Sequence, residues 1–141
     1  MSNSYDDVMA RRSDIMRQAL ALDYDSFQHG DLVFDYDALM SSTGYRLDDV
    51  ARIQAETKVG HTPLYELHRL TEAVREIAGP GKGARILLKD EAANASGSFK
   101  ARRASLSAHE AQVKGFAGMV TATSGNYGAA VASQAAQRGL A

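Results

Sequence analysis

Lys100 is the residue of this sequence best placed to do covalent chemistry. It ends the run Ser98-Phe99-Lys100, which follows an apolar segment over residues 84–90. The apolar segment predicts a short strand, and alanines at helical spacing between Ser98 and Gly115 predict a helix that is capped by Ser98 and has Lys100 in its first turn. A helix N-terminus carries about half a positive charge and disfavours an ammonium group. We therefore expect a neutral, nucleophilic amine that can form a Schiff base with a carbonyl compound.

A second group of polar residues has the same setting. Thr123 ends an apolar run over residues 118–123. Ser124, Gly125 and Asn126 follow it and precede an alanine-rich helix that should end near Gly139. Consecutive strand-helix-strand units are nearly always right-handed and parallel, so both loops should lie at the same edge of one sheet. We expect Lys100 and Asn126 to face one crevice. Free backbone N–H groups at the start of the second helix would bind an anion such as a carboxylate there.

The elements that must position these residues fall into two predicted regions. Residues 1–59 should be helical, with helices over about 4–22, 35–44 and 47–57. Residues 60–141 should begin an α/β domain. Pro63 is expected to open a helix, and its apolar face would comprise Leu64, Leu67, Leu70, Val74 and Ile77.

Three motifs resemble a known enzyme family. Ser96-Gly97-Ser98-Phe99-Lys100, Thr123-Ser124-Gly125-Asn126 and Gly60-His61-Thr62-Pro63-Leu64 resemble the pyridoxal-phosphate enzymes of fold type II, the tryptophan synthase β or threonine synthase type. The resemblance implies that Lys100 holds pyridoxal 5'-phosphate and that Asn126 bonds its phenolic oxygen. It also implies that Thr123, Ser124, Gly125 and Asn126 bind the substrate carboxylate. Ala101 departs from the family, whose threonine synthase members often carry Asp at that position.

The N-terminal half narrows the resemblance to one branch of that family. Residues 9–16, 34–37 and 53–57 are similar to β subunits of the thiolases that split 2-amino-4-oxopentanoate with coenzyme A into acetyl-CoA and alanine during ornithine degradation. This branch implies a small α subunit as partner, an oligomer, and Lys100 as the base that removes the substrate's α proton. Two alternatives stay open. One is β-elimination or β-replacement on a hydroxy amino acid, and the other is a non-catalytic fragment without the rest of the cofactor site.

Composition restricts the class of protein. The 141 residues are 45% hydrophobic and 23% charged, with a net charge of −1, so we expect about one globular domain, no nucleic-acid partner and a cytoplasmic location. Cysteine is absent, which leaves no thiolate for metal binding or catalysis, and the histidines show no metal-ligand spacing. The ending Gly139-Leu140-Ala141 looks like the first step into another strand. We therefore expect the domain to continue beyond residue 141, together with its phosphate-binding loop.

Several residues near the motifs have a plainer interpretation. The glycine-rich run over residues 79–83 joins a helix to a strand, the wrong order for a phosphate loop, and is interpreted as a linker. Arg102 and Arg103 could reach coenzyme A phosphates, but charges just after a helix start more often face solvent. Tyr127 is expected to be a packed aromatic residue, and His61 to be structural.

Overall fold

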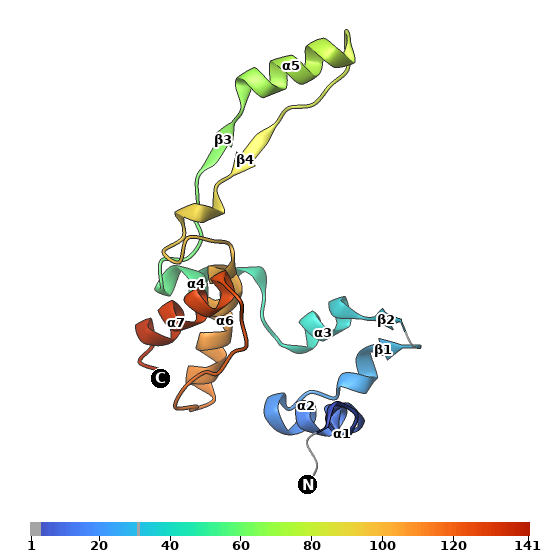
Figure 1. Cartoon of the computed structure of the whole chain (residues 1–141), viewed down its shortest axis with the longest axis vertical. Coiled ribbons are helices and arrows are strands. Elements are labelled where there is room, and N and C mark those ends of the chain that lie inside the picture. Colours follow the sequence, from blue (N-terminus) through green and yellow to red (C-terminus); the bar gives the residue numbers. More distant parts are fainter. Residues whose placement is uncertain (1–3, 31) are drawn as a thin grey trace. The chain divides into compact units, whose positions relative to one another are not determined.

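The structure is a computed structural model, and it describes residues 4–30 and 32–141. Its contacts divide the chain into two compact units, residues 1–46 and residues 47–141 (Figure 1). Each unit is described by itself. The domain boundary predicted at residue 60 stays a prediction, although the helix before it packs within the second unit.

Three short helices make up most of the first unit: α1 (Tyr5–Ala10), α2 (Arg12–Leu20) and α3 (Tyr36–Ser42). The Ser4 hydroxyl accepts a bond from the Asp7 N–H and caps α1, and the Asp35 carboxylate caps α3 in the same way. The single helix predicted over residues 4–22 is wrong in its extent. Arg11 leaves the helical conformation between α1 and α2, and Ala21 ends α2 in the left-handed region at φ 56°.

A small hairpin lies between these helices and was not predicted. The one-turn 3₁₀ helix η1 (Tyr24–Phe27) leads into β1 (Gln28–His29), which pairs antiparallel with β2 (Val33–Phe34). The ring of Phe34 lies 4.6 Å from Tyr24 and 4.8 Å from Tyr36, centroid to centroid. These aromatic contacts favour a hairpin in a segment that is too short and too irregular for a helix.

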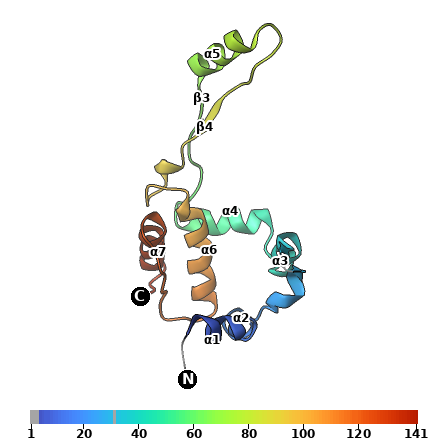
Figure 2. The same cartoon turned by 45° about the vertical axis from the view of Figure 1, so that its right-hand side comes forward.

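Three helices pack together in the second unit: α4 (Leu47–Glu56), α6 (Lys100–Val113) and α7 (Asn126–Gln137). Both α4 and α7 contact α6 (Figure 2). The face of α6 that lies between them is the predicted stripe of Ala101, Ala104, Ala108 and Ala111, all of them buried. Because a methyl group is the largest side chain on this stripe, the helices approach closely around Ile53, Ala130 and Val131.

The segment between α4 and α6 forms a second antiparallel pair. Strand β3 (Leu64–Glu66) pairs with β4 (Leu87–Lys89), and helix α5 (His68–Ala78) connects them. The 3₁₀ turn η2 (Glu91–Ala93) follows β4. The strand expected over residues 84–90 is therefore present. The helix expected to open at Pro63 begins only at His68, because residues 64–66 satisfy their backbone groups by pairing with β4.

The predicted strand over residues 118–123 is not formed, and both sheets in the described part of the chain are two-stranded and antiparallel. A trace of parallel pairing is nevertheless present. The Ala141 N–H donates to the carbonyl of Ala117 at 3.0 Å, and the Met119 N–H donates to the carbonyl of Ala141 at 2.8 Å. One residue bridging two positions in this way is the hydrogen-bond pattern of parallel strands, with α7 as the connection. A longer strand would need a partner at residues 120–123, and the described chain supplies none there.

The structure is thus a mixed α/β, helix-rich fold. None of its described helices has the length and apolar character needed to cross a membrane.

Candidate functional site

Lys100 is the first residue of α6 and so lies in the first turn of a helix, as the sequence predicted. The Ser98 hydroxyl accepts a bond from the Lys100 backbone N–H at 3.3 Å, but the N-cap position is occupied by Phe99 and not by Ser98 as predicted. The side-chain nitrogen lies 4.4 Å from the centroid of the Phe99 ring. Among the described residues no carboxylate pairs with this amine. The amine therefore remains available to a ligand.

The loop over residues 123–126 leads into α7, of which Asn126 is the first residue. The Thr123 hydroxyl oxygen accepts bonds from the N–H groups of Gly125 at 3.2 Å and Gly128 at 3.1 Å. The hydroxyl of Thr123 therefore stabilises the conformation of the loop. The family resemblance had implied that Thr123 binds the substrate carboxylate. The side chains of Ser124 and Asn126 are exposed.

The fold brings the starts of α6 and α7 to the same end of the unit. Near their first turns, the guanidinium of Arg103 lies over the ring of Tyr127, 4.8 Å from its centroid. Near their last turns, the Gln112 side-chain amide donates to the carbonyl of Arg138 at 3.2 Å. Contacts at both ends show that the two helices run in the same direction, so Lys100 and the 123–126 loop lie at one end. The sequence predicted this arrangement through a parallel sheet, and packed helices provide it instead.

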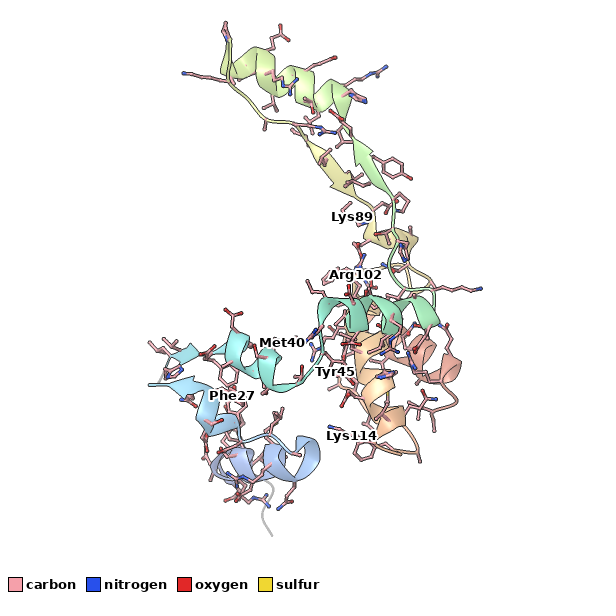
Figure 3. The ribbon with its side chains drawn as sticks, turned by 180° about the vertical axis from the view of Figure 1, so that it is seen from behind. Phe27, Met40, Tyr45, Lys89, Arg102 and Lys114 are labelled. Carbon is pink, nitrogen blue, oxygen red and sulfur yellow. The ribbon has the colours of Figure 1, made fainter. Side chains whose placement is uncertain are left out.

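Beside Lys100, Arg102 and Glu91 form a two-pronged ion pair. The Nε of Arg102 donates to one carboxylate oxygen of Glu91 at 2.7 Å, and Nη2 donates to the other at 2.8 Å. The hydroxyl of Thr62 and the amide of Asn94 also donate to this carboxylate, at 2.8 and 3.0 Å. Gln54 completes the cluster from α4, because its amide nitrogen donates to the carbonyl of Arg102 at 3.3 Å. Arg102 lies where α4, α6 and η2 meet (Figure 3).

These contacts keep Glu91 ionised. The hydrogen bond from Arg102 is the largest influence, and together with those from Thr62 and Asn94 it outweighs partial burial and lowers the pKa of Glu91 to about 2. The Glu91 side chain is 22% exposed and that of Arg102 is 35% exposed. Arg102 is thus committed to a carboxylate on its own chain. Arg102 is partly exposed and paired rather than freely solvated, and its pairing argues against a role in binding coenzyme A phosphates.

The donors at this end fit the chemistry of pyridoxal phosphate. A Schiff base needs an amine free of an ion-pair partner, which Lys100 provides. A substrate carboxylate needs hydrogen-bond donors, and no bond within the described chain uses the backbone N–H groups of Asn126 and Tyr127 at the start of α7. Ala101 is 1% exposed, so an acid at that position would be buried in the helix contact.

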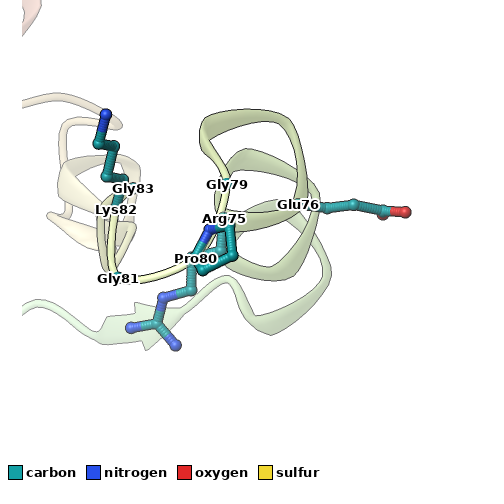
Figure 4. Close-up of a pocket in the computed structure, with 7 residues that line it drawn as sticks. All are labelled: Arg75, Glu76, Gly79, Pro80, Gly81, Lys82 and Gly83. Carbon is teal, nitrogen blue, oxygen red and sulfur yellow. The ribbon is translucent and has the colours of Figure 1, made fainter.

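A separate open pocket lies between the end of α5 and β4. Its lining comprises Arg75, Glu76, Gly79, Pro80, Gly81, Lys82 and Gly83 (Figure 4). The segment joins a helix to a strand, as the linker interpretation predicted. A Cβ on Gly83 would lie 2.9 Å from the Cα of Arg75, so the glycine allows the two segments to approach. None of the predicted site residues lines this pocket.

The cluster around Arg102 is the part of the site that sequence reasoning missed. Glu91 and Asn94 come directly after β4, and polar residues at the end of a strand were the available signal. Thr62 belongs to one of the three motifs, but nothing in the sequence indicated its contact with Arg102, which lies 40 residues further along the chain. Gln54 gave no signal, because it contacts Arg102 across 48 residues of sequence.

Comparisons with known proteins agree with the motifs. A family model described as "Pyridoxal-phosphate dependent enzyme" matches residues 55–141. A 2-amino-4-ketopentanoate thiolase beta subunit from Acetoanaerobium sticklandii is 55% identical over 137 residues, which cover 97% of this chain and 29% of that protein. A protein of the same name from an unknown prokaryotic organism is 57% identical over 137 residues, with the same coverage. The chain thus spans less than a third of the length of these relatives. No solved structure matches it significantly.

Proposed function

Because this chain belongs to the family of pyridoxal-phosphate dependent enzymes, we propose that Lys100 holds the cofactor as a Schiff base. The observation that carries the proposal is the position of Lys100, the first residue of α6, whose amine has no carboxylate partner in the described chain. It lies at the same end of the unit as the loop that leads into α7. Pyridoxal phosphate depends on the protein for a lysine and for an oriented substrate, and this end offers groups for both.

The other predicted site residues have distinct proposed roles. The Asn126 amide is exposed and can bond the phenolic oxygen of the cofactor. Ser124 and the first N–H groups of α7 bind the substrate carboxylate, where the helix end favours a negative charge. Thr123 shapes the loop through its two accepted hydrogen bonds, and Gly125 is part of the same loop.

We propose that the reaction is thiolytic cleavage of 2-amino-4-oxopentanoate, within the catalytic β subunit of an acyltransferase. Support comes from relatives that carry the thiolase name at 55% and 57% identity. Bound pyridoxal phosphate supplies an electron sink next to the substrate's amino group. Lys100 removes the proton from the second carbon. The thiol of coenzyme A adds to the ketone at the fourth carbon, and the bond between the third and fourth carbons breaks. The third carbon gains the proton that the thiol gives up, and the proton taken from the second carbon is returned to it. The products are acetyl-CoA and alanine.

A partner subunit is part of the proposal. The word "beta" in the relatives' names indicates a second kind of subunit in those proteins, and we propose that this chain works with a small α subunit in an oligomer. Coenzyme A and a small amino acid are the proposed ligands.

The decisive experiment uses the full-length protein co-expressed with its α subunit and supplied with pyridoxal phosphate, coenzyme A and 2-amino-4-oxopentanoate. Mass spectrometry should detect acetyl-CoA with the unchanged protein and none with Lys100→Ala. Lys114→Ala is a matched control, because Lys114 follows the other end of α6 and pairs with Glu110 at 3.3 Å. The control should retain activity.

Other outcomes separate the alternatives. If the protein binds the cofactor through Lys100 but forms no thioester, and instead releases a keto acid from a hydroxy amino acid, the reaction is elimination rather than thiolysis. If Lys100→Ala still gives a borohydride-stable cofactor adduct at the active site, the assignment of the lysine is wrong.

A further inference from the structure

The first turn of α6 is held by side-chain contacts from other segments, in addition to the hydrogen bonds of the helix itself. Residue 102 is held through both its side chain and its backbone: its guanidinium binds Glu91, and its carbonyl accepts bonds from the Gln54 amide at 3.3 Å and the Ser105 hydroxyl at 2.9 Å. Glu91 belongs to η2, directly after β4, and Gln54 belongs to α4. Three separate segments therefore meet at one residue of this turn.

Helix geometry links this residue to Lys100. Two positions along an α-helix differ by about 200° around its axis, so Lys100 and Arg102 project in nearly opposite directions from the same turn. A rotation of the turn that moved one side chain would move the other by the same angle. Holding Arg102 in a two-pronged pair, which fixes both distance and plane, therefore fixes the direction in which the Cα–Cβ bond of Lys100 leaves the helix.

We propose that Glu91 and Arg102 are positioning residues, whose ion pair sets the direction in which Lys100 meets the cofactor. The inference rests on the proposed role of Lys100. The carboxylate acts through Arg102 and the helix turn, and neither residue needs to touch the substrate. Thr62 and Asn94 support the pair by donating to the same carboxylate.

A second ion pair on the same helices gives the structural comparison. Arg138 donates to Glu56 at 3.0 Å and joins α7 to α4. Arg138 directly follows the last residue of α7, at the end of the unit away from the first turn of α6. Breaking this pair should loosen the helix packing without turning Lys100. Glu56→Gln is therefore the matched control for Glu91→Gln, since each replaces one glutamate that pairs with arginine.

The experiment measures cofactor attachment rather than turnover. Full-length proteins are mixed with a limiting concentration of pyridoxal phosphate, and samples are treated with borohydride at successive times. Peptide mass spectrometry then gives the fraction of Lys100 that carries the reduced adduct, and its increase with time gives the rate of attachment. We expect Glu91→Gln to lower the rate of attachment at Lys100 by about tenfold or more, because small misplacements of a reacting group are costly. Glu56→Gln should remain within about twofold of the unchanged protein at a temperature where both are folded.

A conservative variant guards against simple unfolding. Arg102→Lys keeps the positive charge but loses the two-pronged geometry. It should fold, as circular dichroism would show, and attach the cofactor at a rate between those of Glu91→Gln and the unchanged protein. In the complete reaction, kcat should fall more than KM rises for Glu91→Gln, because the substrate-binding loop before α7 is unchanged.

Distinct results would overturn the two proposals. If the unchanged protein attaches the cofactor at Lys100 and Glu91→Gln attaches it equally fast, or no slower than Glu56→Gln, the positioning role is wrong and the Schiff-base assignment stands. If the unchanged protein forms no adduct at Lys100, the proposed function itself fails.

Discussion

The guanidinium of Arg103 lies over the ring of Tyr127, 4.8 Å from its centroid, and joins the first turn of α6 to the first turn of α7. Tyr127 also packs against the small core around Ala104, Ala130 and Val131. Tyr127 thus packs against the helix core and also contacts the guanidinium of Arg103. The contact helps to keep Lys100 and the 123–126 loop at one end of the unit.

Arg103→Gln should therefore destabilise the protein modestly. Loss of a cation–π contact at an exposed position costs about 0.5–1 kcal/mol, which thermal unfolding of the full-length protein would register as a small fall in Tm. Tyr127→Phe keeps the ring under the guanidinium and should lie between Arg103→Gln and the unchanged protein. Equal stability of Arg103→Gln and the unchanged protein would show that the contact contributes nothing.

Gly128→Ala should disrupt the loop before α7. A Cβ at this position would lie 2.2 Å from the Cγ2 of Thr123, so Thr123 would have to move and its bonds to the loop would weaken. We expect a loss of about 1–3 kcal/mol in unfolding free energy and a raised KM for the amino acid.

Two further variants test this explanation. Gly125→Ala should be tolerated, because its added Cβ meets open space and its φ of 177° is ordinary extended backbone. Thr123→Ser removes the clashing methyl group and keeps the hydroxyl, so combining it with Gly128→Ala should recover part of the loss. If the double variant is no more stable than Gly128→Ala, the clash with the Thr123 methyl group is not the cause of the stability loss.

Glu91 should make stability depend on pH in the acid range. Its pKa is about 2 in the folded protein, against an ordinary value of 4.5. A carboxylate with a lowered pKa stabilises the fold fully above its ordinary pKa and loses that contribution as the pH falls toward the folded value. The pair should contribute about 2 kcal/mol at pH 7, and this contribution should disappear between about pH 4.5 and pH 2.

Urea unfolding of the unchanged protein and of Glu91→Gln across this range would measure the effect. The difference in unfolding free energy should shrink toward zero at pH 2. Glu76→Gln, on the exposed face of α5, should differ little from the unchanged protein at any pH. A difference that stays constant from pH 7 to pH 2 would contradict the assignment to Glu91.

Arg138→Met should lower Tm by about 5 °C or more. The Arg138 side chain is only 6% exposed and donates to Glu56 at 3.0 Å, to the carbonyl of Ile53 at 3.3 Å and to Gln112 at 3.1 Å. Removal of the guanidinium leaves these acceptors without their partner, which costs more than the lost bonds alone. Arg138→Lys should fall between the two proteins, and an unchanged Tm for Arg138→Met would show that water replaces the guanidinium.

The sequence predicted the elements whose signals are local. Alanines at helical spacing located α6 and its buried face, and the helices expected to start near residues 4 and 35 begin at Tyr5 and Tyr36. Local signals failed where pairing with a distant segment decided the structure. Pro63 suits a helix start, but the three residues after it pair with β4. Their partners lie 21 to 25 positions further along the chain, from Glu66 with Leu87 to Leu64 with Lys89.

The candidate site divides in the same way. Lys100 and Asn126 could be proposed from the sequence because each ends a recognisable motif, and each begins a helix in the structure. The Glu91 and Arg102 pair was not predicted, because its geometry depends on how η2, α4 and α6 fold against one another. Arg102 in particular has the sequence setting of a solvent-exposed cation, and only the tertiary structure gives it a partner.

The buried alanines of α6 have a mechanical consequence. A core of larger, flexible side chains can absorb a small displacement by changing rotamers, but a methyl group has no rotamer to change. On the α6 side, the contact with α4 and α7 therefore cannot adjust by changing rotamers. A bulkier residue at Ala104 or Ala108 would tilt α6 as a rigid body, and the tilt would displace the N-terminal end of the helix, where Lys100 lies. The position of Lys100 thus depends on the small size of the buried alanines of the same helix.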